Sequence, residues 1–403
     1  MELFWLEHKK LWRKKIVKIC VLLCFVYCVI FGSILLFQWF GFGSSDDYTS
    51  AFGNNFDGYT VIKDSQEYAL SFGGELTDET LQKIVSDYQQ MEADGMEEEL
   101  EKTDWQIVNS WLGTLYPELR DTSNYKTMIS YVDPDKLTGF YERRQQVLDE
   151  FLEVSGQVGA EKEFLHQIER KVEKPFHYEW VEGWSTLLGS MVADLGVVMA
   201  LFLGIVLSSL FAGEWHDNTS TLVLTTRNGW GKIALAKILT GLAFTVELFA
   251  LLAVSSVISQ LFFMGTAGWD MPIQNIKLIA VAPMNMLQAE IYEYAFVLLG
   301  AIGFAGIVMF ISAAVKNNVL TLLLSLAVVY GPMMIAEYLP YGMQKALDLI
   351  PLVGSSTDIF RTNTFRIFGK LIWSPYLLIT IPVLIGILCM PFAIKSWSRR
   401  MKA

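Results

Sequence analysis

Long apolar runs divide this sequence into alternating hydrophobic and polar parts. A helix needs about twenty consecutive apolar residues to cross the hydrocarbon core of a bilayer. Six runs meet or approach this length, and only the third contains a charged residue, Glu247. The pattern predicts a polytopic α-helical membrane protein with six transmembrane helices. The runs are 19–43, 195–211, 238–269, 294–315, 317–336 and 371–394.

The polar segments between these runs complete a predicted division of the chain. Only the segment between the first and second runs has the length of a domain. We predict spans at 16–43, 184–211, 233–268, 294–315, 319–338 and 371–394. The other parts are an amphipathic N-terminal helix at 1–15, an external domain at 44–183, a cytoplasmic segment at 212–232, an external connector at 269–293, a cytoplasmic turn at 316–318, an external re-entrant or interfacial segment at 339–370, and a cytoplasmic tail at 395–403.

The polar segment between the first two runs has the pattern of a mainly helical domain. Thr77 is a suitable N-cap, and apolar residues follow it at helical spacing from Leu81 to Tyr88. A second amphipathic segment begins near Thr138, and a third ends before Pro175. A chain of about 140 residues is long enough to form its own hydrophobic core.

Basic residues flank the first and last runs and set the predicted orientation. Lys and Arg concentrate on the cytoplasmic side of membrane proteins. We therefore expect both termini to be cytoplasmic, which six spans satisfy. The flanking residues are Lys9, Lys10, Arg13, Lys14, Lys15 and Lys18 before the first run, and Lys395, Arg399, Arg400 and Lys402 after the last.

The net charge of −11 is distributed unevenly along the chain. Residues 41–183 contain 30 acidic and 12 basic residues, whereas the rest of the chain has an excess of basic residues. An acidic external domain and basic flanks facing the anionic inner leaflet account for this division. The charge gives no support to nucleic-acid binding.

All four cysteines lie in predicted spans. Cys20, Cys24 and Cys28 share one helix face in the first span, and Cys389 is in the last. A soft-metal site needs ligands from other elements as well, so small residues on a packing face explain the spacing better than a metal site. The external domain has no cysteine and must fold without disulfides, which favours the surface of a Gram-positive-type bacterium over a disulfide-rich context.

The segment between the second and third runs carries a recognisable motif. Its sequence from position 211 to 237 is FAGEWHDNTSTLVLTTRNGWGKIALAK. It resembles the coupling segment of permease subunits of ATP-binding-cassette exporters of the type-2 class. In that family a Glu and a Thr or Ser open a short cytoplasmic helix, and a Leu-rich turn, an Arg element and a Lys follow. The matching residues are Glu214, Thr219, Leu222, Leu224, Thr225, Arg227, Lys232 and Lys237.

Two further stretches extend the resemblance to the external domain. GGELTDETLQKIVSDY and KPFHYEWVEGW are similar to the domain that a subset of these permeases carries between the first and second spans. The family also has an N-terminal interfacial helix, and the amphipathic segment 3–12 either touches an ATPase subunit or anchors the chain in the membrane.

The resemblance implies one half of an ATP-driven exporter in the cell membrane. The chain has no phosphate-binding loop, so Mg-ATP would bind to two separate ATPase subunits, and the chain itself needs no cofactor. A second permease, identical or related, would complete the pore within membrane lipid. The class transports hydrophobic or amphipathic substrates such as peptide antibiotics, drugs or lipid-like molecules. The implied ATPase-coupling residues are Glu214, Asp217, Thr219, Leu222, Arg227 and Lys232, and an ordinary charged loop is the alternative.

Four acidic residues are candidates for a translocation path. Glu247 is inside a predicted span, where a charge is costly unless it faces a cavity or a partner. It either lines the path or accepts a hydrogen bond from a neighbouring helix. Asp194 lies near the outer end of the second span, and Glu290 and Glu293 close the external connector.

No catalytic or metal-binding motif is present in the sequence. Neither an H-E-x-x-H helix nor a G-x-S-x-G turn occurs, and the four histidines are scattered along the chain. These observations make an intramembrane hydrolase unlikely. The remaining alternative to a transport subunit is a membrane sensor or scaffold whose external domain binds a ligand without transport.

Overall fold

A computed structural model describes most of the chain. The described residues are 2–37, 62–63, 66–67, 69, 73–96, 105–121, 126–217, 219, 231–354 and 363–399. The protein is mostly helical, and in the described part five helices are long and apolar enough to cross a membrane. These are Leu195–His216, Lys232–Met264, Met286–Ala314, Asn318–Tyr338 and Ser374–Ser398. The structure thus agrees with a polytopic helical membrane protein, and six spans stay a prediction.

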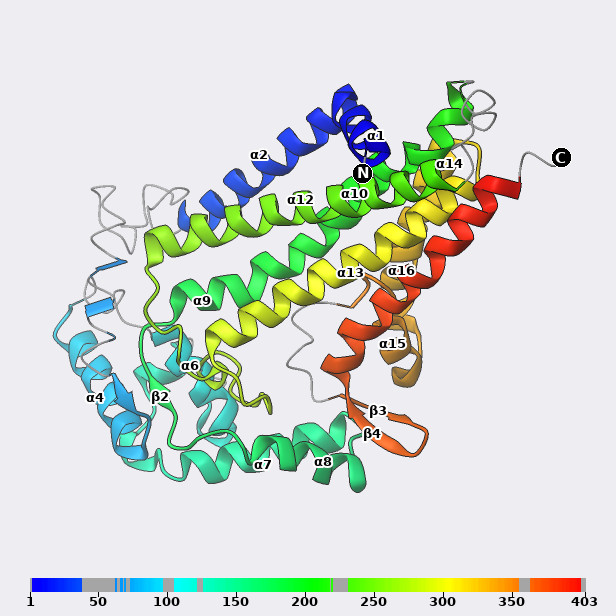
Figure 1. Cartoon of the computed structure of the whole chain (residues 1–403). Coiled ribbons are helices and arrows are strands. Elements are labelled where there is room, and N and C mark those ends of the chain that lie inside the picture. The colour runs from blue at the N-terminus through cyan, green and yellow to red at the C-terminus, as the bar shows by residue number, and fades with distance from the viewer. Residues whose placement is uncertain are drawn as a thin grey trace.

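The apolar helices form one bundle (Figure 1). Helix α13 is central and packs most extensively against α16 and α10, while α12 packs against α1, α2 and α13. Helix α2 occupies the place of the first predicted span. The bounds are α1 Glu2–Arg13, α2 Lys15–Phe37, α9 Glu182–Thr186, α10 Val192–His216, α12 Lys232–Met264, α13 Met286–Ala314, α14 Asn318–Ile335, α15 Tyr341–Leu347 and α16 Ser374–Arg399.

Glycines bring α13 and α16 into close contact. A Cβ atom on Gly306 would lie 2.5 Å from the carbonyl oxygen of Gly386, and one on Gly303 would overlap the carbonyl of Pro382. Small residues allow two helix backbones to approach without side chains between them. This contact explains why two helices so rich in large apolar residues share such an extensive interface.

Helices α10 and α13 extend beyond the predicted span limits at positions that carry candidate site residues. Helix α10 continues to His216, so Glu214 lies in its last turns, whereas the sequence places it in a segment after the span. Helix α13 begins at Met286 instead of 294, because Asn285 and Gln288 form a capping box. Glu290 and Glu293 therefore lie inside a helix instead of in the external connector.

The predicted helical domain contains the helices that its periodicity indicates. Thr77 caps α4 by accepting a hydrogen bond from the Thr80 amide, and the apolar face of α4 is buried. Helix α7 begins two residues after Thr138. The elements are β1 Gly74–Glu75, α4 Asp78–Ala93, α6 Trp105–Leu115, α7 Phe140–Val154, α8 Ala160–Glu169 and β2 His177–Tyr178, with 3-10 turns at Pro117–Leu119, Met128–Ser130 and Pro134–Lys136.

The domain has its own core and is joined to the segment that precedes α13. Its core includes Trp111, Phe140 and Phe176, and β1 and β2 pair in antiparallel register. Arg144 is fully buried and donates hydrogen bonds to the carbonyls of Leu278 and Ala280, at 2.7 Å and 3.1 Å. The domain is therefore attached to the bundle by specific hydrogen bonds in addition to the chain itself.

A β-hairpin lies at the boundary between the predicted re-entrant or interfacial segment and the predicted sixth span, and the sequence analysis did not predict it. The short helix α15 begins this segment, and strands β3 (Thr364–Ile367) and β4 (Lys370–Trp373) pair after it. Phe368 and Gly369 both have positive φ angles, as a tight two-residue hairpin turn requires. The hairpin contacts the domain through Arg366 and Glu161, whose closest atoms are 2.6 Å apart.

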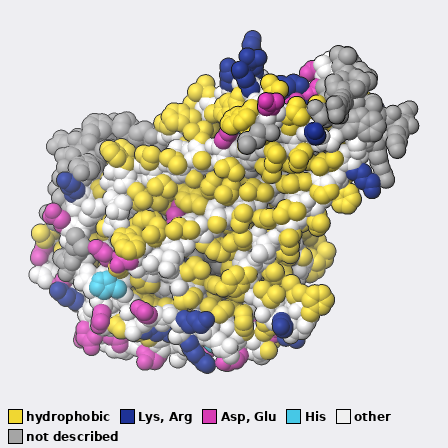
Figure 2. Space-filling view, in the orientation of Figure 1, with side chains coloured by type: hydrophobic (Ala, Val, Ile, Leu, Met, Phe, Trp, Pro, Cys, Tyr) yellow, Lys and Arg dark blue, Asp and Glu magenta, His cyan; other side chains and the backbone are white. Residues whose placement is uncertain are grey.

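The termini and the helical domain lie at opposite ends of the molecule (Figure 1). Helix α1, the end of α16, the end of α10 and the start of α12 are at one end, and α4 to α8 are at the other. Hydrophobic side chains cover the middle of the face in Figure 2, with charged side chains gathered toward the ends. The arrangement agrees with the predicted sidedness, although which end faces the cytoplasm stays a prediction.

Candidate functional site

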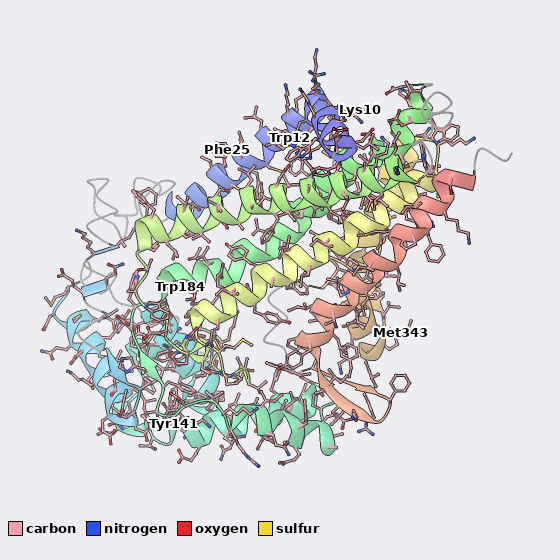
Figure 3. All side chains as sticks on the ribbon, in the orientation of Figure 1. Lys10, Trp12, Phe25, Tyr141, Trp184 and Met343 are labelled. Atoms are coloured by element: carbon pink, nitrogen blue, oxygen red, sulfur yellow. The ribbon has the colours of Figure 1, made fainter. Side chains whose placement is uncertain are left out.

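Helix α1 lies against the first turns of α12 and supplies half of the candidate site. Its apolar residue Leu11 is buried, and the Trp12 ring lies 6.0 Å from the Phe244 ring. The opposite residues of α1 carry charge, which gives the helix the amphipathic pattern predicted for it. Trp12 and Lys10 are labelled on this helix in Figure 3.

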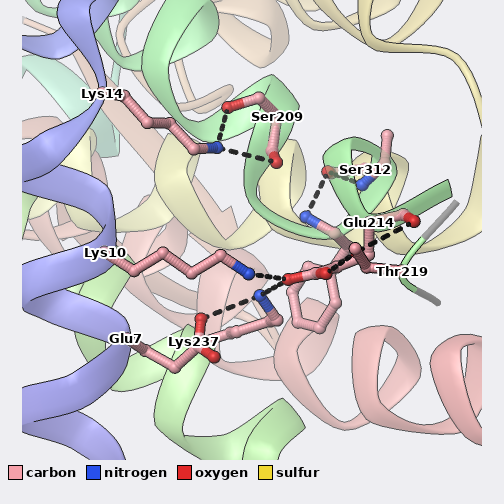
Figure 4. A network of polar contacts seen from close by, with 10 residues as sticks. Glu7, Lys10, Lys14, Ser209, Glu214, Thr219, Lys237 and Ser312 are labelled. Carbon is pink, nitrogen blue, oxygen red and sulfur yellow. Dashed lines mark hydrogen bonds and ion pairs between the residues drawn. The ribbon is translucent and has the colours of Figure 1, made fainter. Parts of the chain in front are cut away.

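Glu214 is the centre of a buried polar cluster, which we call the Glu214 cluster (Figure 4). Its Oε1 atom lies 2.8 Å from Lys237 Nζ and 2.5 Å from Lys10 Nζ. The hydroxyl of Thr219 donates to the other carboxylate oxygen at 2.5 Å, and Glu7 pairs with Lys237 at 2.8 Å. The cluster consists of Glu7, Lys10, Glu214, Thr219 and Lys237, and it joins α1, α10 and α12.

Electrostatic balance keeps the cluster charged in spite of its burial. Only 4% of Glu214 and 2% of Lys237 are exposed, so each charge requires a partner. Burial lowers the pKa of Lys10, but the hydrogen bond and charge of Glu214 outweigh it, and the pKa is raised overall. Burial and the charges of Lys237 and Lys10 lower the pKa of Lys14, which bonds to Ser209 Oγ at 2.9 Å.

A second contact fixes the end of α10 to α13. The hydroxyl of Ser312 accepts hydrogen bonds from the amides of Phe211 and Ala212, both at 3.1 Å, and donates to the carbonyl of Ser208 at 2.7 Å. Ser312 is fully buried. The backbone just before Glu214 is therefore held by α13, and its side chain is held by α1 and α12.

The structure brings together only part of the predicted coupling set. Glu214 and Thr219 are in direct contact, while Asp217 is exposed at the end of α10 and acts on Lys10 through its charge. Lys232 is exposed at the first position of α12. Leu222, Leu224, Thr225 and Arg227 lie outside the described residues.

The candidate path residues occupy separate places. Glu247 contacts α1, with His8 Nε2 at 3.1 Å and Trp12 Nε1 at 3.0 Å. Glu247 therefore has partners on a neighbouring helix, as the alternative of a hydrogen-bond acceptor requires. Its role on a translocation path stays a prediction. Asp194 belongs to α10. Glu290 and Glu293 are buried in α13, with 3% and 0% of their surface exposed.

The cysteine spacing corresponds to a packing face. Cys20, Cys24 and Cys28 are all buried in the apolar core beside α12. Within the described ranges no group of three or more histidine, cysteine or acidic side chains is arranged to hold a metal ion.

Sequence reasoning missed the contribution of α1 to the site. The motif includes Glu214, Thr219 and Lys237, but it contains no indication that Glu7 and Lys10 come from a helix more than two hundred positions away. The available signal was the row of charges on one face of the amphipathic helix, which the sequence equally assigns to lipid headgroups.

No protein-family model matches the sequence, and neither the curated proteins nor the solved structures include one that is similar to it. The resemblance to exporter permeases accordingly rests on the sequence motif.

Proposed function

We propose that this protein is the transmembrane permease half of an ATP-driven exporter. It would move a hydrophobic or amphipathic substrate, such as a peptide antibiotic, a drug or a lipid-like molecule, out of the cell. Energy would come from two separate ATPase subunits that bind Mg-ATP. The observation that carries the proposal is the Glu214 cluster, which ties three helices together where the predicted coupling segment begins.

A rigid anchor is what a coupling segment needs. Movement of an ATPase subunit reaches the spans only if the segment that it pushes is firmly attached to them. Glu214 is held through charge by Lys10 and Lys237, and the neighbouring backbone is held by Ser312. A push on the segment after Asp217 would therefore move α1, α10 and α12 together instead of bending a loose loop.

Apolar surface on two helices supports the proposed membrane setting and partner. Large side chains on α14 and α16 are about half exposed, which suits lipid or a second permease, identical or related. We place the protein in the plasma membrane of a Gram-positive-type bacterium, as a multi-pass subunit. The exposed residues are Leu320, Leu323, Leu324, Leu384, Ile387, Leu388 and Phe392.

Capture of the native complex tests the proposal. The tagged protein is purified from its host in mild detergent, and ATP hydrolysis by the captured material is measured for wild type, Glu214→Gln and the matched control Glu337→Gln. Glu337 is exposed and lies outside the cluster. We expect an ATPase subunit with wild type and control, and at least a tenfold loss of ATP hydrolysis per captured complex with Glu214→Gln. Capture without any ATPase would contradict the proposal and favour a sensor or scaffold.

A further inference from the structure

The inference concerns two glutamates of α13 that do not belong to the Glu214 cluster. Glu290 and Glu293 are three positions apart, so their side chains lie on neighbouring parts of the helix surface, with Cβ atoms about 5–6 Å apart. Each acts on the other or on Tyr294 through its charge. They lie in the first turns of a helix that begins next to the external connector.

Both carboxyl groups are buried without a hydrogen bond. Glu290 is 3% exposed and Glu293 is fully buried, and all four carboxyl oxygens lack a hydrogen-bond partner in the described part of the chain. This sets them apart from the other buried acidic residues in that part, since Glu214 and Glu169 each bind two basic side chains.

The surrounding groups offer no counter-charge inside the site. The Tyr294 hydroxyl lies close enough to Glu290 to act on it at short range, and it acts on Glu293 through charge. Its geometrically formed hydrogen bond is with Ser256 Oγ, at 2.6 Å, and not with either carboxyl group. The hydroxyl of Tyr292 donates a hydrogen bond to the carbonyl of Pro375. Tyr292 also interacts electrostatically with Glu293 and with Tyr376 on α16. The basic group that acts on the pair, Lys277, is exposed on the connector and forms no ion pair with either glutamate in the described residues.

Two adjacent ionised carboxylates would be very unfavourable in such a place. An unpaired charge loses its hydration on burial, and two like charges at short range repel each other. A carboxylic acid that holds its proton avoids both costs. A metal ion would need further oxygen ligands or water, and the described residues around the pair present no third acidic, histidine or cysteine ligand.

We propose that Glu290 and Glu293 form a proton-binding site that is occupied at neutral pH and loaded from the side of the external domain. We place the entry at the connector because it directly precedes the first turns of α13, and because the charge of its exposed Lys277 reaches Glu293. The site itself does not depend on the proposed exporter function, since it rests on the burial of the two carboxyl groups and on their lack of a counter-charge.

Infrared spectroscopy of the full-length protein in lipid nanodiscs tests this inference. The carbonyl stretch of protonated carboxylic acids is recorded at pH 7 and identified by its shift in heavy water. The variants are Glu290→Gln and Glu293→Gln, in which the amide has the shape of a neutral acid, and the control is Glu337→Gln, at an exposed position just after α14. We expect the signal in wild type and control, a loss of about half in each single variant, and a decrease as the pH is raised.

The second measurement is thermal unfolding of the same samples, carried out once in sodium chloride and once in choline chloride at equal concentration. Because Gln replaces a neutral acid, both single variants should unfold within a few degrees of wild type, and sodium should not stabilise wild type selectively. Absence of the protonated-acid signal at pH 7 would overturn the proposal. The proposal would also be overturned if sodium stabilised wild type and neither Gln variant, because this would indicate a bound cation. Failure of both Gln variants to fold would overturn it as well.

Discussion

Glu214 and Lys237 are separated by 23 positions in the sequence, yet their Oε1 and Nζ atoms lie 2.8 Å apart with both side chains almost completely buried. The pair connects the end of α10 with the second turn of α12, and thus spans both ends of the predicted coupling segment. Lys10 approaches the same carboxylate oxygen from α1. The segment between the two helices therefore starts and finishes at one fixed point.

Replacement of Lys237 by Met should strongly destabilise the protein. Removal of one partner from a buried ion pair leaves an uncompensated charge and costs roughly 3–5 kcal/mol. Lys10 and Thr219 would still bind Glu214, so we expect a value at the lower end. The measurement is the unfolding midpoint in detergent, with Lys9→Met, an exposed lysine on a face of α1 that points away from the cluster, as control. Equal midpoints for the two variants would show that the cluster does not stabilise the fold.

The junction between the helical domain and the bundle should be sensitive to acid. Glu169 binds Arg144 at 2.6 Å and Lys174 at 2.8 Å. Burial raises the pKa of Glu169, but the two basic partners outweigh it and lower the pKa overall. A lowered carboxyl pKa contributes stability that is present above the unfolded value of about 4.3 and is lost as the pH falls through the folded value.

We therefore expect the unfolding temperature of wild type to fall more than that of Glu169→Gln, which has no carboxyl group at this position, as the pH is lowered below about 4.3. Arg144→Met should be destabilised near neutral pH by roughly 3–5 kcal/mol, because ionised Glu169 stays buried with a single partner. Parallel pH profiles for wild type and Glu169→Gln would contradict the assignment of this acid dependence to Glu169.

Close packing of α13 on α16 predicts opposite effects for two glycine substitutions. Gly306→Ala places a methyl group 2.5 Å from the Gly386 carbonyl and should cost about 1–3 kcal/mol through overpacking. Gly331→Ala, within α14, meets no atom within 4 Å and should be neutral or stabilising by up to about 1 kcal/mol through helix propensity. Thermal unfolding in one detergent compares the two, and a Gly306→Ala protein as stable as wild type would refute the close contact.

The contact of Glu247 with α1 distinguishes its two sequence interpretations. Glu247→Leu removes the acceptor for both Trp12 and His8, whereas Glu247→Gln keeps a side-chain oxygen for Trp12. Loss of a hydrogen bond to a charged group costs about 1.5–3 kcal/mol, so α1 should detach more often in Glu247→Leu. Trypsin cleavage after Lys9 or Lys10 reports this release, with Val246→Ala, an exposed neighbour, as control. An unchanged cleavage rate with impaired transport would instead favour a place on the path.

Local signals in the sequence predicted most of the helices. They succeeded where the spacing of apolar residues and a capping residue are compatible with only one type of secondary structure. The Thr77 cap and the apolar spacing after it determine α4 without any tertiary information. The start of α13 was missed although its signal is local, because the capping box of Asn285 and Gln288 lies within a segment read as a connector. Hydropathy marks where a helix enters an apolar layer, whereas capping residues mark where the helix begins.

The candidate site was predictable only in part, since its contacts are not local. Glu214 and Thr219 are five positions apart and belong to one motif, but Lys10 contacts Glu214 across 204 positions. The charge pattern of α1 is compatible with lipid headgroups and with a protein partner alike. Only the packing of α1 on α12 shows that the charged residues of α1 in the site contact protein instead of lipid headgroups.

Cross-linking from the end of α10 tests the central claim most directly. Asp217 is exposed and lies next to the Glu214 cluster, so Asp217→Cys presents a thiol where the account places the ATPase subunit. The control is Glu153→Cys on the helical domain, at an exposed position on the opposite end of the molecule. With a short thiol-reactive cross-linker applied to host membranes, the account predicts a product between Asp217→Cys and an ATPase subunit whose yield changes with nucleotide, and none from Glu153→Cys. Cross-linking of the ATPase subunit to Glu153→Cys would contradict the proposed coupling site. So would the lack of any cross-link between the ATPase subunit and Asp217→Cys in membranes that contain both proteins.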